Sequence, residues 1–333
     1  MRSSVPPPVT QVMDEAQAWL PGRLAAVERR LVELTGGHGA LLAGDAGATL
    51  AAGGKRLRPL LVLLCAGPSS GDEAVRAATA IELVHMATLV HDDVLDGAPL
   101  RRGHPTVAAR SGRGRAVAAG DLLFSRAFAE LGGSGNDRQV ELLSSASVAL
   151  ALGELAQRRD AFNTSIPAQR YLERCLLKTA RLFECACLIG RSSNGNAAGG
   201  DDAGAGGDGL GAFGRHIGLA FQLLDDVLDV TGPPERTGKA VGTDLLDGTV
   251  TLPLILARES DRELGGLDLR GFDEAGAARI CERIAATDAL DRVRELARER
   301  VAEAKQALTH AGRSADERRL LELVADGVVE RYS

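Results

Sequence analysis

The sequence is poor in aromatic residues and in the alternating β-branched runs that build sheets. Phe, Trp and Tyr make up 3% of the 333 residues. Ala, Leu, Arg and Glu, which are strong helix formers, are abundant instead. Clean polar–apolar alternation, the usual mark of a half-buried strand, is hard to find. The composition therefore argues against a large sheet and favours helices.

The chain also lacks an excess of basic charge and a long apolar run. Its formal net charge is −6, with Lys and Arg scattered among Asp and Glu, whereas a nucleic-acid binder needs a basic face. The first residues, MRSSVPPPVT, have no apolar core of the kind that a signal peptide needs. The run PLLVLLCAG is too short to span a bilayer. These features predict a soluble, cytoplasmic protein that does not bind nucleic acid.

Cysteine is scarce. The five cysteines are odd in number and show no zinc-like pair spacing with matching histidines. Cys185 and Cys187 are close in sequence, but they are too isolated to make a metal site. Reduced thiols in a cytosolic protein are the better interpretation.

Helical periodicity is what the sequence has in quantity. From Leu290 to Leu308, apolar residues step by three or four between Arg and Glu, which is the pattern of one apolar stripe on a solvated helix. Similar stripes predict helices around residues 13–34, 73–96, 116–131, 138–159, 169–190, 212–231 and 315–331. Residues 1–12, with three consecutive prolines, are predicted to form a loose tail. Residues 13–333 are predicted to form a single domain, with a Gly-rich loop at 194–211, because the patterning is alike on both sides of it.

The pentapeptide DDVLD occurs twice in apolar surroundings. The two copies contain Asp92, Asp93 and Asp96, and Asp225, Asp226 and Asp229. On a helix the first and third aspartates of each copy share a face, where their like charges repel, and burial raises that cost. A divalent cation would relieve both effects, and carboxylates suit Mg²⁺ together with waters and phosphates. An exposed acidic face is the plainer alternative for one copy, but two such copies favour a metal.

Basic residues flank the first copy. GGKRLRP supplies Lys55 and Arg58 after two glycines that let a backbone approach a ligand closely. GAPLRRGHP places Arg101 and Arg102 just past the expected helix end, and arginine pairs bind phosphate oxygens in bidentate fashion. His85 precedes the first aspartate by seven residues and so shares its helix face. Each cluster alone is typical of a solvated loop, but together with two metal-type motifs they predict a ligand with more than one phosphate.

The order of these motifs resembles that of the trans-isoprenyl diphosphate synthases, or polyprenyl synthetases. GGKRLRP, DDVLD with LRRG, KTA, FQLLDDVLD, GKAVGTD and TLPLI occur here in that family's order. The resemblance implies an all-α, isoprenoid synthase fold, with helices around a deep central cavity and the two aspartate motifs facing each other across its mouth. It also implies a homodimer and a Mg²⁺-dependent condensation of isopentenyl diphosphate with an allylic diphosphate, which gives an all-trans polyprenyl diphosphate.

The resemblance also implies roles for individual residues. About three Mg²⁺ ions would be held by Asp92, Asp96, Asp225 and Asp229, while Asp93 and Asp226 would hydrogen-bond instead. The isopentenyl diphosphate pocket is matched by Lys55, Arg58, His85 and Arg102. The groups on the allylic diphosphate are matched by Arg101, Lys178 and Lys239. The dipoles facing the developing allylic cation would belong to Thr179 and Gln222. One position departs from the family, because Thr249 stands where many members have a diphosphate-binding Lys.

Small residues before the first motif predict a long product. Ala87 and Thr88 stand where short-chain members carry bulky aromatic residues that act as a floor to the cavity. One helical turn rises about 5.4 Å, comparable to one isoprene unit, so a missing floor should admit further units. Deeper candidates for the floor are Val84, Ile81, Leu123 and Phe124. Close helix packing is the plainer alternative; under the floor hypothesis, Ala87→Phe would shorten the product.

Three other functions are weighed against this one. They are a short-chain (farnesyl or geranylgeranyl) diphosphate synthase, a class I terpene cyclase and a non-catalytic subunit of a heterodimeric synthase. A cyclase has no need of the second diphosphate site that Lys55, Arg58 and His85 would supply. A non-catalytic subunit would be expected to lack aspartates, and both motifs are intact here. Peripheral contact with a membrane, while a greasy product leaves, is also compatible with the sequence.

Overall fold

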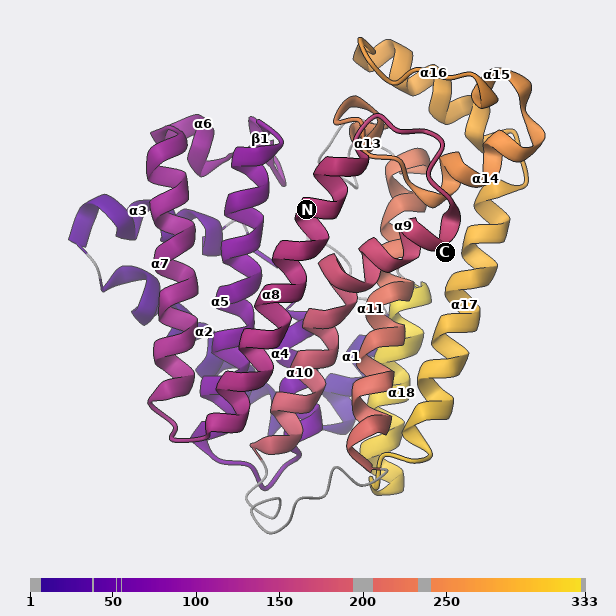
Figure 1. Ribbon diagram of the computed structural model, residues 1–333. Coiled ribbons are helices and arrows are strands. Elements are labelled where there is room, and N and C mark those ends of the chain that lie inside the picture. Colours follow the sequence, from indigo (N-terminus) through magenta and orange to yellow (C-terminus); the bar gives the residue numbers. More distant parts are fainter. Residues whose placement is uncertain are drawn as a thin grey trace.

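The computed structural model describes residues 7–37, 39–51, 53–54, 56–193, 206–232 and 241–330. A set of long helices runs side by side along the molecule (Figure 1). These helices are α5 (Asp72–Leu95), α7 (Arg113–Gly132), α8 (Asp137–Asp160), α10 (Arg181–Ser192), α11 (Gly206–Thr231), α17 (Ala289–Leu308) and α18 (Ala315–Glu330). The all-α prediction is confirmed.

Shorter elements complete the described part of the chain. The first are α1 (Pro7–Glu15), α2 (Leu20–Gly36), α3 (Gly39–Ala51), α4 (Leu57–Ala66), α6 (Val107–Ser111), α9 (Ala168–Cys175) and the π-helical turn η1 (Leu176–Ala180). The later ones are α13 (Thr243–Leu246), α14 (Leu252–Ser260), α15 (Arg262–Gly265) and α16 (Glu274–Ala285). The strands β1 (Leu100–Arg101) and β2 (His104–Pro105) form a small antiparallel hairpin in which Leu100 faces Pro105.

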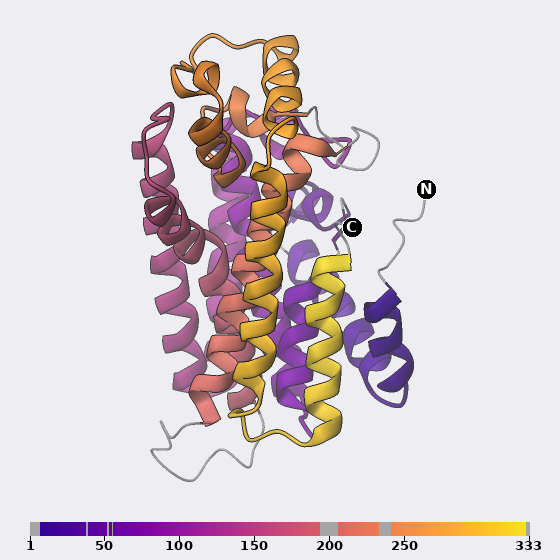
Figure 2. The same cartoon turned by 90° about the vertical axis from the view of Figure 1, so that its right-hand side faces the viewer.

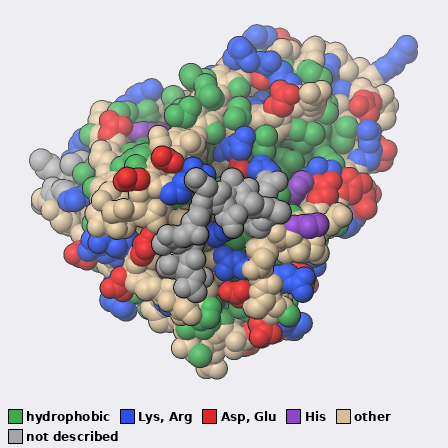
Figure 3. Space-filling view, turned by 60° about the horizontal axis from the view of Figure 1, so that its bottom comes forward, with side chains coloured by type: hydrophobic (Ala, Val, Ile, Leu, Met, Phe, Trp, Pro, Cys, Tyr) green, Lys and Arg blue, Asp and Glu red, His purple; other side chains and the backbone are tan. Residues whose placement is uncertain are grey.

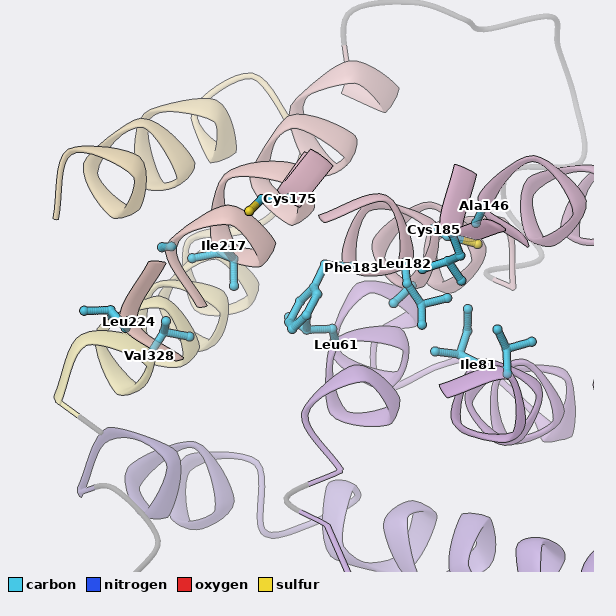
Figure 4. Close-up of a cluster of buried hydrophobic side chains, with 14 of the residues drawn as sticks. Leu61, Ile81, Ala146, Cys175, Leu182, Phe183, Cys185, Ile217, Leu224 and Val328 are labelled. Atoms are coloured by element: carbon cyan, nitrogen blue, oxygen red, sulfur yellow. The ribbon is translucent and has the colours of Figure 1, made fainter. Parts of the chain in front are cut away.

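The core lies where α4, α5, α10 and α11 meet. Leu61, Ile81, Phe183 and Ile217 are fully buried there (Figure 4). Burial of apolar surface of this kind stabilises a fold by roughly 25 cal/mol for each Å² removed from water. The core therefore holds α5 and α11, the two helices that carry the aspartate motifs, in one packed body.

The N-terminal region differs from the prediction. Residues 13–34 form two helices rather than one, because α1 ends at Glu15 and α2 begins at Leu20. Pro21 lies in the first turn of α2, where its missing N–H is harmless, whereas inside a continuous helix it would remove a hydrogen bond and clash. The loose tail predicted for residues 1–12 is wrong for residues 7–12, since α1 begins at Pro7 and buries Val12 against the body. Residues 1–6 lie outside the described residues.

Two further differences lie between α9 and α11. The stripe at 169–190 passes through the π-helical turn η1, whose single extra residue hardly alters an apolar period measured over a whole helix. The Gly-rich loop predicted for 194–211 is wrong for residues 206–211, because α11 begins at Gly206. Residues 194–205 lie outside the described residues. A Cβ on Gly209 would lie 2.7 Å from the Ala307 carbonyl oxygen. This glycine therefore serves close packing of α11 on α17 rather than a loop.

Both aspartate motifs lie at one end of the bundle. Helix α5 ends at Leu95 and leads into β1, and α11 ends at Thr231 before the segment that leads to α13. Figure 1 shows β1 and α13 at the upper end, and Figure 2 shows α14–α16, in orange, at the same end. Two motifs far apart in the sequence are thus brought to the same end of the molecule.

The described surface is mixed in charge. On the face shown in Figure 3, Lys and Arg side chains are interspersed with Asp and Glu. Among the described residues, no helix combines the length and the apolar character needed to cross a bilayer.

Candidate active site

The first aspartate motif ends α5. Asp96 follows the last helical residue, but its backbone remains helical and its N–H donates to the Asp92 carbonyl at 2.8 Å. The two side chains therefore share a face, as their spacing predicted. Burial raises the pKa of Asp92 to about 6, and Glu154 and Asp96 add to this effect while Lys178 opposes it. A carboxylate so placed gains from a nearby cation.

The middle aspartate of each motif points into the protein. Asp93 is buried and accepts a hydrogen bond from Arg101 Nε at 2.7 Å. Asp226 is buried and accepts from the Tyr171 hydroxyl at 2.5 Å and from Gln222 Nε2 at 2.8 Å. Both aspartates thus hydrogen-bond within the protein, which is the role expected of them.

The second motif presents its outer aspartates on α11. Asp225 is exposed and Asp229 is half-buried. Asp229 Oδ2 accepts the backbone N–H of Asp244 at 3.2 Å, and the Asp229 carbonyl accepts the N–H of Gly242 at 2.9 Å. The third aspartate is therefore tied to the start of α13, so α13 positions it.

The π-helical turn η1 is connected to both motifs, through two residues that are adjacent in the chain. Lys178 Nζ lies 3.9 Å from Asp92 Oδ1 of the first motif. Thr179 Oγ1 donates to Gln222 Oε1 at 2.7 Å, and Gln222 in turn bonds Asp226 of the second motif. A π-helical turn rotates successive side chains differently from an α-helix, and such turns are frequent at functional sites. The KTA segment therefore bridges the two copies of DDVLD.

Two glycines allow η1 to pack closely between α8 and α11. A Cβ on Gly153 of α8 would lie 2.6 Å from the backbone nitrogen of Lys178. A Cβ on Gly218 of α11 would lie 2.6 Å from the Cα of Ala180. Contacts under 3 Å force something to move. The close approach of α8, η1 and α11 thus depends on these positions having no side chain.

The two basic loops meet at Gly54. A Cβ there would lie 3.0 Å from Arg56 Nη1 and 3.3 Å from Arg102 Nη1. Arg56 and Arg102 both have left-handed backbones, with φ of 48° and 52°. That conformation is uncommon for residues with a side chain, and such strain collects at functional sites. The described arginines of GGKRLRP and LRRG therefore form one basic region beside the first motif.

Arg58 and His85 line this basic region. Burial lowers the pKa of Arg58 to about 10, while Glu82 and Asp225 favour its charge and Arg102 disfavours it. Its guanidinium lies 4.4 Å from the centre of the Phe183 ring. Burial, reinforced by Arg58 and Arg102, holds the pKa of His85 well below its usual value. Near pH 7 His85 is thus neutral and offers one N–H donor to a ligand.

The proposed floor residues divide into two groups. Ala87, Val84, Ile81 and Leu123 are fully buried, or nearly so. Thr88 and Phe124 are partly exposed. The Thr88 hydroxyl donates to the His85 carbonyl at 2.8 Å, and the Phe124 ring stacks on His91 with 6.0 Å between centroids. Of the six positions, Thr88 and Phe124 are therefore the two that a bound molecule could contact without disturbing the core.

Two predicted site residues lie outside the described part of the chain, and two residues that contact the first motif and Lys178 were not predicted. Lys55 and Lys239 lie outside the described residues. Glu154 and Arg158 of α8, which pair with Lys178 and Asp96, were missed by the sequence analysis. Their i, i+4 spacing was visible, but an acid–base pair so spaced is ordinary on a solvated helix.

The donor chemistry of the motifs fits Mg²⁺. Within the described ranges, no group of three or more His, Cys, Asp or Glu side chains is close enough to hold a metal ion alone. Mg²⁺ is typically held by one or two carboxylates and completes its shell with water and substrate phosphate. Carboxylates spaced in this way, beside a basic region, match that manner of binding.

Comparison with known proteins agrees with this geometry. A family model described as polyprenyl synthetase matches residues 41–268. Heptaprenyl diphosphate synthase component 2 of Geobacillus stearothermophilus is 38% identical over 279 residues, which cover 83% of this chain and 85% of that protein.

Two solved structures extend the likeness over nearly the whole chain. A polyprenyl synthase from Caulobacter crescentus CB15, complexed with calcium and isoprenyl diphosphate, has a TM-score of 0.88 at 35% identity and 99% coverage of both chains. A decaprenyl diphosphate synthase from Rhodobacter capsulatus has a TM-score of 0.85 at 32% identity, covering 97% of this chain and 99% of that one. The chain belongs to the polyprenyl synthetase family, and it is an enzyme of the prenyltransferase class.

Proposed function

We propose that this enzyme condenses isopentenyl diphosphate with an allylic diphosphate, in the presence of Mg²⁺, to make a long-chain all-trans polyprenyl diphosphate. The observation that carries the proposal is the π-helical turn η1. Its Lys178 lies beside the first aspartate motif, and its Thr179 connects to the second through Gln222. One rigid element thus positions a cation and a dipole between the two acidic motifs.

The residues around η1 suit the first half of such a reaction. Bound Mg²⁺ would neutralise the leaving diphosphate and so lower the barrier to breaking the allylic C–O bond. The aspartates that would hold it are Asp92, Asp96, Asp225 and Asp229. Lys178 and Arg101 would bind the oxygens of the allylic diphosphate. Thr179 and Gln222, whose mutual hydrogen bond fixes their orientation, would direct dipoles at the developing positive charge.

The basic region suits the second substrate. Arg58 and Arg102 would bind the phosphates of isopentenyl diphosphate, and the neutral His85 would donate its N–H. By their place in the sequence motifs, Lys55 would join the isopentenyl diphosphate site and Lys239 the allylic diphosphate site. Thr249, which replaces a family lysine, would contribute no charge, so one phosphate contact would be weaker here.

A long product is supported by the small side chains one turn before Asp92. Thr88 is partly exposed there, and its side chain is smaller than the aromatic ring that would act as a floor. The names of two similar proteins, a heptaprenyl and a decaprenyl diphosphate synthase, agree with this proposal.

The test is elongation of farnesyl diphosphate by the purified enzyme with isopentenyl diphosphate and Mg²⁺. We expect a ladder of products that extends beyond geranylgeranyl diphosphate, resolved by length after dephosphorylation. Products that stop at geranylgeranyl or shorter would contradict the long-chain proposal. Consumption of the allylic diphosphate without isopentenyl diphosphate would indicate a cyclase instead.

A homodimer is proposed on the basis of an apolar stripe on α8. Val148, Leu152 and Leu155 are spaced along one side of the helix and are 57%, 52% and 66% exposed. Large apolar side chains in a row mark an interaction surface, and a second copy of the chain would cover it with the same surface. The heptaprenyl relative is described as a component 2, so a different partner subunit is the alternative occupant.

Leu152→Glu should convert a dimer of the purified chain to a monomer, because a charge would be buried at the centre of the stripe. Sedimentation velocity measures the change. Val32→Glu is the matched control, since Val32 is 60% exposed on α2, and it should leave the dimer intact. If the wild-type chain is monomeric and is inactive until a second protein is added, the homodimer proposal is wrong and a heterodimer takes its place.

A further inference from the structure

The cluster beside the first motif contains a cation with no role in the proposed reaction. Arg158 lies near the end of α8, one turn after Glu154. Its guanidinium pairs with the Asp96 carboxylate and also bonds Glu154 Oε1 at 2.6 Å. Arg158 thus occupies a carboxylate that the proposed function gives to the metal.

Glu154 joins the two basic side chains that face the first motif. One of its oxygens accepts from Arg158 Nε, and the other accepts from Lys178 Nζ. Each cation also approaches one motif carboxylate, since Arg158 pairs with Asp96 and Lys178 lies 3.9 Å from Asp92. Glu154 is therefore the shared anchor of two counter-ions, one for each outer aspartate.

The charges of the cluster explain why such counter-ions are useful. Asp92, Asp96 and Glu154 are three acids, and without compensation they would repel one another in a partly buried place. Arg158 and Lys178 supply two positive charges. A divalent cation would supply the same charge, so a counter-ion and a metal stabilise the same carboxylates and compete for them.

We propose that Arg158 is a positioning residue that competes with the divalent cation for Asp96 and so sets the metal concentration at which the first motif fills. The inference rests on the proposed function, which assigns Asp96 to the metal. When a metal binds, Arg158 releases Asp96 and keeps its bond to Glu154. Its side chain is partly exposed, so water can solvate the guanidinium nitrogen released from Asp96 without a change in the backbone.

The test is Mn²⁺ binding, measured by electron paramagnetic resonance of the free ion. Inorganic diphosphate is present at one fixed concentration, and a protein-free sample corrects for its own binding of Mn²⁺. Arg158→Gln should lower the Mn²⁺ dissociation constant about two- to fivefold, the range of a partly exposed ion pair. Arg158→Lys keeps a charge on the same stem and should stay near the wild-type value.

The neighbouring arginine provides a matched control. Arg159 is 70% exposed and lies 3.9 Å from Asp160 rather than beside Asp96. Arg159→Gln removes the same charge from the same helix, and it should leave the dissociation constant unchanged. If the dissociation constant changes equally in both variants, the effect comes from the net charge of the protein and the inference is overturned.

The remaining outcomes separate this inference from the proposed function. If the wild type binds Mn²⁺ but the dissociation constant of Arg158→Gln is unchanged or higher, the competition between Arg158 and the metal is overturned. The assignment of the motif to the metal is then unaffected. A structural defect in Arg158→Gln would weaken Mn²⁺ binding, whereas the competition predicts tighter binding. If Asp96→Asn binds Mn²⁺ as the wild type does, or if the wild type binds none, then the assignment of the motif to the metal fails.

Discussion

Asp225→Asn is expected to lower kcat by roughly 10³-fold, the largest effect of any single change considered. Asp225 is exposed at the end of the bundle where both motifs lie, so it can reach a metal without any rearrangement of the core. An amide cannot replace the charge of a carboxylate toward Mg²⁺, and metal stabilisation of a leaving phosphate contributes several kcal/mol to the barrier. The measurement is initial rate with saturating Mg²⁺ and both diphosphates.

The control for this substitution is Asp291→Asn. Asp291 is 85% exposed on α17, far along the sequence from both motifs, and the same exchange there should leave kcat unchanged. The temperature of unfolding should remain the same in both variants, because neither side chain is part of the core. If Asp225→Asn keeps more than about a tenth of the wild-type rate, the second motif is not needed for metal binding in the form proposed.

Thr88→Phe is expected to shorten the product by one or more isoprene units. Thr88 is four residues before Asp92 on the same face of α5 and is partly exposed. A ring at this place would close the path of the tail about one helical turn, or 5.4 Å, below the first aspartate. Product lengths from farnesyl diphosphate and isopentenyl diphosphate measure the effect, with total turnover of the primer as a check that the enzyme is active.

Thr88 is a better position for this test than Ala87. Ala87 is fully buried, and extra atoms in a packed core cost about 1–3 kcal/mol of stability. Ala87→Phe should therefore shorten the product too, but with a lower temperature of unfolding. Thr88→Val, which has nearly the same size as threonine, is the matched control and should leave the product ladder unchanged. A full-length ladder from an active Thr88→Phe enzyme would place the floor elsewhere.

The predicted helices show where periodicity is reliable. The stripe at 73–96 matches α5 (Asp72–Leu95), and the stripe from 290 to 308 matches α17 (Ala289–Leu308). A long helix with one buried face leaves its period in the sequence whatever it packs against. The short helices α3 and α6 and the turn η1 leave no such record, because their positions depend on neighbours distant in the chain.

The candidate site shows the same division. The acidic motifs were visible because they place charges in apolar surroundings, where burial of an unpaired charge is costly. The basic motifs gained meaning only from their place in the sequence beside the first acidic motif. Glu154 and Arg158 were not visible, since a helical acid–base pair needs no ligand to explain it. Their role in the cluster follows from the approach of α8 to η1, which Gly153 permits.

The sequence by itself determined the all-α class and the acidic and basic motifs, because helical period and misplaced charge are local properties. Only the tertiary structure decided how the two copies of DDVLD are joined. Lys178 and Thr179 are adjacent in the chain, yet one faces the first motif and the other connects to the second. That arrangement depends on a π-helical turn held between α8 and α11, each of which approaches it closely at one glycine. Packing of this kind is fixed by the whole fold rather than by any one segment.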